Sequence, residues 1–196
     1  MTDCSAEDSI RRLIESWVIW RDTGDFDRLA GAWHADGRMI TTGGEASAAE
    51  FVSNARRAWD AGLDVVHTIG GLAIEIVGER AVAHSRLMIS QRVSLDGIAC
   101  DVECRGRFID LLECRDGRWA IVLRHPAYDR DRIVACSGQV LPPLDPERLA
   151  RFPTGYRHLA YVQSLMGMQV HDDLPGRTGP AMEALSAKAR AWLDGD

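Results

Sequence analysis

The sequence predicts an α+β domain, and three observations carry this prediction. Residues 5–21 place apolar side chains at helical spacing, whereas residues 64–127 alternate with the period of two that is typical of strands. Helical patterns come first along the chain and an antiparallel meander follows, an order that favours helices packed on one face of a sheet. Behind the meander, a proline-rich segment leads back to helical patterns.

Three helices and one strand are predicted in the first third of the chain. Ser5, Asp25 and Ser47 each stand directly before an apolar-periodic stretch, where a short polar side chain caps a helix. Ser5 is followed three residues later by Asp8, which resembles a capping box. The helices are expected over residues 5–21, 25–33 and 47–61, with a strand over residues 37–42.

Four long strands are predicted next, and the residues between them are Gly78-Glu79, Asp96-Gly97 and Asp116-Gly117, which are typical of hairpins. In the third strand an apolar set alternates with charged residues, so one face is buried. Asp110 belongs to the apolar set and therefore needs a partner. The four strands are expected over residues 64–77, 80–95, 98–113 and 118–127.

A boundary is predicted near residue 130, between a domain over residues 1–130 and a C-terminal helical extension over residues 131–196. Three prolines between residues 142 and 146 exclude a sheet interior there. Two helices are expected beyond them, over residues 147–167, with a break possible at Pro153, and over residues 178–193.

Composition excludes several classes of partner. The chain of 196 residues carries 23 basic and 29 acidic residues, a net charge of −6, and no basic run. Nucleic acid is therefore not an expected partner, because phosphate binding needs a basic face. No apolar stretch approaches the roughly 20 residues that span a bilayer, and the first five residues do not resemble a signal peptide. We expect a cytoplasmic protein with no membrane partner.

The cysteines indicate neither a disulfide framework nor a metal centre. Five cysteines are present, at positions 4, 100, 104, 114 and 136, and neither CxxC nor HxxxH occurs. Free thiols are the expected state in the cytosol. We predict no metal site and no cofactor.

Several segments together resemble a known family. A helix ends in Trp20-Arg-Asp-Thr-Gly-Asp-Phe-Asp-Arg-Leu29, Trp33-His-Ala-Asp-Gly37 follows, and the strand-rich half closes on Arg115-Asp-Gly-Arg-Trp119. Their order and spacing over about residues 8–130 resemble the SnoaL-like branch of the nuclear transport factor 2-like superfamily, which includes dehydrochlorinases, scytalone dehydratase and bile-acid dehydratases. The resemblance implies a cone: a strongly curved antiparallel sheet around helices, one deep pocket, and homodimers or homotrimers formed through the outer sheet face.

The resemblance also implies site residues. Asp22 and His67 match the carboxylate and the base of a catalytic dyad, and Arg124 matches an arginine that faces the pocket. Trp17 stands where some dehydratases have tyrosine, and it offers only an indole N–H. Thr41 stands where ketosteroid isomerases have an aspartate base, which argues against that chemistry. The implied substrate-binding residues are Trp17, Ile19, Met39, Met88, Ser90, Phe108 and Asp110.

The implied reaction is a cofactor-independent elimination from a small hydrophobic or polycyclic molecule. Neutral His67 would take a proton from carbon, Asp22 would fix its tautomer, and Arg124 would stabilise the departing group. Alternatives stay open at this point. His67 could be an inert buried histidine, Asp22 a helix-end carboxylate, and Arg124 a partner of Asp110. A polyketide-type cyclase or isomerase using the same base, or a non-catalytic binding module, would fit the same fold.

Overall fold

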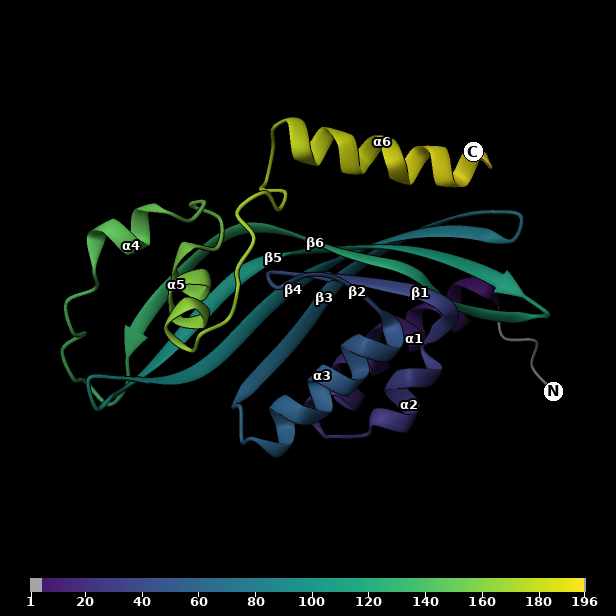
Figure 1. The fold of residues 1–196 in the computed structure, drawn as a ribbon. Coiled ribbons are helices and arrows are strands. Elements are labelled where there is room, and N and C mark those ends of the chain that lie inside the picture. The colour runs from purple at the N-terminus through teal and green to yellow at the C-terminus, as the bar shows by residue number, and fades with distance from the viewer. Residues whose placement is uncertain (1–4, 196) are drawn as a thin grey trace.

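The computed structural model describes residues 5–195 and has the predicted α+β architecture. A curved, open sheet of six strands runs through the molecule in the order β2-β1-β6-β5-β4-β3. Helices α1, α2 and α3 lie against one face of the sheet, and α6 lies across the opposite face (Figure 1). The main apolar core fills the space between the first three helices and the inner face.

The N-terminal helices are α1 (Ala6–Asp22), α2 (Phe26–Gly31) and α3 (Ala48–Asp60). The predicted caps are confirmed, because the side chains of Ser5, Asp25 and Ser47 each accept a hydrogen bond from a backbone N–H of the first turn. Only the last of them forms the full capping box, with Glu50. One stripe of α1 is buried in the core, and its members are Ile10, Ile14, Trp17 and Val18.

The four long strands are confirmed as an antiparallel meander of β3 (Val65–Val77), β4 (Arg80–Leu95), β5 (Ile98–Arg115) and β6 (Arg118–Ala135). Asp96 and Asp116 have φ values of 49° and 52° in the turns, each followed by a glycine with positive φ, as hairpin turns of the primed types require.

Strand β6 continues to Ala135, beyond the end predicted at residue 127. It passes through Pro126, a residue that normally disfavours a sheet interior. Its pairing with β1 ends at Arg124, so β5 is the one strand of the described residues that pairs with the later half of β6. A proline is tolerated there because no second described strand needs its missing N–H. The predicted domain boundary at residue 130 therefore falls inside a strand.

Strands β1 (Trp33–Thr41) and β2 (Gly44–Ser47) complete the sheet. Strand β1 starts four residues earlier than predicted, and β2 was not predicted. Because β1 pairs with β6 in parallel, the sheet is mixed rather than wholly antiparallel. A parallel pair between strands so far apart in sequence leaves no hairpin signal, whereas the antiparallel pairs of the meander do.

The C-terminal extension contains α4 (Pro146–Ala150), α5 (Arg157–Leu165) and α6 (Pro180–Asp194). The first predicted helix is thus broken into two at Pro153. The carboxylate of Asp131 in β6 accepts hydrogen bonds from the backbone N–H groups of His158 and Leu159 and caps α5. Helix α6 packs its apolar stripe on the outer face of the sheet. The stripe comprises Met182, Leu185 and Ala189.

Within residues 5–195, Cys100, Cys104, Cys114 and Cys136 are free thiols, and Cys4 lies outside the described residues. No helix in that range is long and apolar enough to cross a membrane. No group of three or more His, Cys, Asp or Glu side chains in the described part of the chain is placed to hold a metal ion.

Candidate active site

Asp22 and His67 lie within hydrogen-bond reach although 45 residues separate them in sequence. Asp22 is the last residue of α1, and His67 is the third residue of β3. One carboxylate oxygen of Asp22, Oδ1, lies 2.9 Å from the imidazole Nδ1, and the other oxygen accepts the backbone N–H of His67. The two contacts fix both the ring and the strand against the end of α1.

The hydrogen bond to Asp22 determines the tautomer of His67. A carboxylate accepts, so Nδ1 carries the proton and the lone pair is on Nε2. Among the described residues, the imidazole is hydrogen-bonded through Nδ1 and not through Nε2, and His67 lines an apolar pocket on the inner face of the sheet. The indole of Trp17 contacts the ring edge-on, with centroids 6.2 Å apart. Such an imidazole can accept a proton from a molecule in the pocket.

Burial lowers the pKa of His67 below its ordinary value of about 6.5. The hydrogen bond from Nδ1 to Asp22 opposes that effect, and the nearby charges of Arg21 and Arg124 add to the lowering. The side chain is 10% exposed. The histidine is therefore neutral at pH 7, the state that a general base requires.

This lowered pKa predicts how stability depends on pH. The unfolded chain takes up a proton at about pH 6.5, before folded His67 does, so the free energy of unfolding falls as the pH drops from about 6.5 toward the folded pKa. His84 and His125 have lowered pKa values too, so the contribution of His67 is measured as the difference in stability loss between the wild type and a variant without His67. We expect His67→Gln to lose less stability than the wild type between about pH 7 and pH 5 in urea titrations. Equal losses in the two proteins would contradict a lowered pKa.

The pocket has a volume of about 760 Å³ and lies between α1, α3, the inner face of the sheet and the segment around α5. Its walls are largely apolar and aromatic. Trp17 and Phe51 stack at 5.7 Å, and Phe108 meets Trp17 edge-on at 5.9 Å. Met39 and Ile89 add aliphatic surface. Of the predicted wall residues, the structure therefore brings Trp17, Met39 and Phe108 together with His67.

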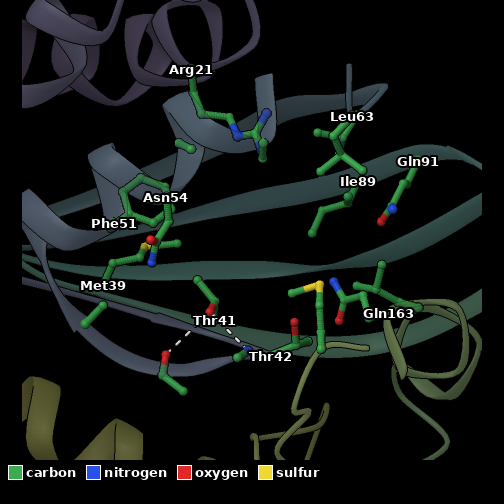
Figure 2. Close-up of a pocket in the computed structure, with 18 of the residues that line it drawn as sticks. Arg21, Met39, Thr41, Thr42, Phe51, Asn54, Leu63, Ile89, Gln91 and Gln163 are labelled. Carbon is green, nitrogen blue, oxygen red and sulfur yellow. Dashed lines mark hydrogen bonds between the residues drawn. The ribbon is translucent and has the colours of Figure 1, made fainter. Parts of the chain in front are cut away.

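Many polar side chains also line this pocket, and Figure 2 shows several of them. Arg21 extends into it from α1, opposite Thr41, while Gln91 and Gln163 line another side. The amide nitrogen of Gln91 donates to the sulfur of Met166 at 3.6 Å. The phenol of Tyr128 also lines the pocket, and burial raises its pKa well above its usual range, so it is a neutral group at pH 7.

Arg124 and Asp110 do not face the pocket, contrary to the prediction. Both side chains are fully buried, and Arg124 donates from Nε and Nη2 to the two carboxylate oxygens at 2.6 and 2.9 Å. The guanidinium lies 4.3 Å from the ring centre of Trp17 and 4.6 Å from that of Phe108. Those two rings separate the ion pair from the pocket. The buried carboxylate of Asp110, for which the sequence predicted a partner, is thus paired with Arg124.

Three predicted wall residues lie elsewhere. Ile19 is 60% exposed, because it falls outside the stripe of α1 that faces the core. Met88 and Ser90 point to the outer face of the sheet. The register pairs His67 with Ile89, and residues directly opposite in a sheet share a face, so Ile89 and Gln91 face the pocket instead.

The strand itself contained the signal for this correction. Arg86 and Arg92 share the parity of Met88, and charged side chains mark the outer face of a strand. Gln91 could have been found in the same way, as a polar residue in the buried set. No pattern in the sequence distinguishes Arg21 from the other arginines of α1, because the local sequence does not tell whether the end of a helix lies at a pocket or in solvent.

Comparison with known proteins agrees with this fold. The family model of the SnoaL-like domain matches residues 2–125. A PEP2-like protein of Fusarium vanettenii is 31% identical over 198 residues, which cover 95% of this chain and 85% of that protein. Pea pathogenicity protein 2 of the same fungus is 28% identical over the same shares. The similarity to both relatives extends through the C-terminal extension.

Two solved structures share the fold at low identity. The hexachlorocyclohexane dehydrochlorinase LinA-type3 of Novosphingobium barchaimii has a TM-score of 0.56 at 20% identity, over 70% of this chain and 95% of that one. A putative scytalone dehydratase of Novosphingobium aromaticivorans has a TM-score of 0.54 at 16% identity, over 74% and 97%. With the match of the family model, these likenesses place the fold in the nuclear transport factor 2-like superfamily, and the chain belongs to its SnoaL-like domain family.

Proposed function

We propose that the protein is a lyase-type enzyme that eliminates water or a halide from a small, largely apolar molecule. The hydrogen-bonded pair of Asp22 and His67 at the wall of an apolar pocket carries this proposal. Neutral His67 takes a proton from a carbon of the substrate, the electrons of that C–H bond form the double bond, and the group on the neighbouring carbon leaves. A halide leaves as the anion, whereas a hydroxyl leaves as water with the proton that the imidazolium returns. Asp22 holds the imidazolium that forms. Dehydrochlorinase and dehydratase relatives of the same fold support this class of reaction.

Arg21 takes the place that the sequence suggested for Arg124. It is the arginine beside the dyad that reaches the pocket, and its Nη1 donates to Asp22 at 3.3 Å. Burial lowers its pKa, the ion pair with Asp22 opposes this effect, and the group stays cationic at neutral pH. A cation fixed next to the base stabilises negative charge that develops on the substrate or on its leaving group.

Replacement of Arg21 by glutamine is expected to lower kcat about a hundredfold, because the donor at the developing charge is lost. Lysine at this position should restore part of the rate. Arg12→Gln, on an exposed face of the same helix, removes the same charge and serves as the control. Steady-state kinetics of the three variants test this role, and an unchanged kcat in Arg21→Gln would remove Arg21 from the mechanism.

The proposed function itself is tested by incubating the protein in D₂O with a panel of hydroxylated and chlorinated ring compounds, followed by NMR. Elimination products from the wild type and none from His67→Gln would support the proposal. A rearranged product that keeps every group of the substrate, apart from exchange of hydrogen for deuterium, would replace it with the cyclase or isomerase reaction. Saturable binding without chemistry or deuterium exchange would overturn it in favour of a binding module.

A further inference from the structure

A second hollow lies on the outer face of the sheet, separate from the pocket that holds His67. It has a volume of about 820 Å³. Asp129 is the one carboxylate among the described side chains that line it, and arginines are in excess there. The groove is therefore basic, whereas the whole chain has a net charge of −6. Five arginines from β4, β5, β6 and the loop before α6 surround this groove, and we call them the arginine cluster: Arg86, Arg105, Arg107, Arg130 and Arg177.

The register of the sheet places these arginines in like-charge pairs. Arg86 on β4 lies directly opposite Arg107 on β5, and Arg105 on β5 lies directly opposite Arg130 on β6. Like charges at opposite positions of neighbouring strands destabilise a sheet. The folded protein therefore carries an electrostatic cost at this groove, and a bound anion would relieve it.

Carboxylates of the protein neutralise only part of the cluster. Arg107 contacts Asp129 at 3.4 Å, and Arg105 is 3.9 Å from Glu103. Within residues 5–195, Arg86, Arg130 and Arg177 have no carboxylate within 4.0 Å, and all three are exposed. Arg107 also donates to the backbone carbonyl of Arg177 at 3.3 Å, which ties the loop before α6 to the sheet.

We propose that the arginine cluster binds a small ligand that carries two or more phosphate-type oxyanions. Guanidinium groups bind such oxyanions through two parallel N–H···O bonds. Neighbouring strands are about 4.8 Å apart, so the arginines of β4, β5 and β6 are spaced for adjacent phosphate groups. A second copy docked symmetrically on this groove would set arginines against arginines, which favours a separate anion as the occupant.

The test is titration calorimetry with tripolyphosphate at low ionic strength, because screening weakens exposed charges. The cluster variant combines Arg86→Gln with Arg130→Gln, two arginines that hold no carboxylate. The control variant combines Arg12→Gln with Arg190→Gln, exposed arginines of α1 and α6, and changes the net charge equally. We expect the cluster variant to bind at least about tenfold more weakly than the wild type, and the control variant to bind as the wild type does.

Thermal unfolding of the ligand-free proteins separates weaker binding from misfolding. Because like charges are removed, the thermal midpoint of the cluster variant should be at or above that of the wild type. No binding by the wild type, or equal weakening in both variants, would overturn the proposal. Sedimentation with phosphatidylcholine vesicles that contain phosphatidylinositol bisphosphate identifies the source. If the wild type sediments with these vesicles and the cluster variant does not, the ligand is a lipid headgroup. Binding of tripolyphosphate without sedimentation would assign a soluble anion, and both results support the site.

Discussion

His67→Gln is expected to lower the rate of the proposed elimination by about a hundred- to ten-thousandfold while the protein stays folded. Glutamine has no basic nitrogen to replace Nε2, so proton removal from carbon loses its acceptor. Its amide nitrogen can still donate to the carboxylate of Asp22, which keeps α1 attached to β3. The measurement is kcat of wild type and variant on a substrate found in the panel, together with thermal midpoints.

Asp22→Asn gives the second measurement on the same pair. The carboxylate accepts both the backbone N–H and Nδ1 of His67, whereas an amide has one acceptor oxygen. Either the tautomer or the strand contact is then lost, and we expect kcat to fall by orders of magnitude as well. When Asp22→Asn and His67→Gln are combined, the fall in kcat should be smaller than the sum of the two single effects, because both residues act as one unit. Additive losses would mean that Asp22 and His67 act separately.

Arg124→Met is expected to destabilise the fold by about 3–5 kcal/mol, the largest stability effect among these variants. It leaves Asp110 buried among apolar side chains with no partner for its charge. It also removes the guanidinium that packs against Trp17 and Phe108, two rings that form the pocket wall. Urea denaturation of wild type and variant measures the loss.

The double variant Asp110→Leu with Arg124→Met is the control for that interpretation. Replacement of both members of a buried ion pair removes the unpaired charge, so the double variant should be more stable than Arg124→Met alone. If the double variant is the less stable of the two, the loss comes from packing around the guanidinium rather than from the buried carboxylate.

Local patterns were sufficient for most of the fold. The caps of α1, α2 and α3 and the hairpins between the long strands depend on residues that are neighbours in sequence, and they lie where the sequence predicted them. The parallel pairing of β1 with β6 was beyond such patterns, because it joins segments some eighty residues apart. The resemblance to the family supplied the curved sheet packed on N-terminal helices, and the structure has this arrangement (Figure 1).

The candidate site shows the same division. The sequence by itself determined which residue types were available: a carboxylate at the end of a helix, a histidine in a strand, and aromatic side chains for a wall. Only the tertiary structure decided which of them meet. The distance between Asp22 and His67, the burial of Arg124 behind two rings and the entry of Arg21 into the pocket depend on the packing of α1 against the sheet. The side chains that share a cavity are set by the register of paired strands and the angle of a helix, which arise from contacts summed over the whole core.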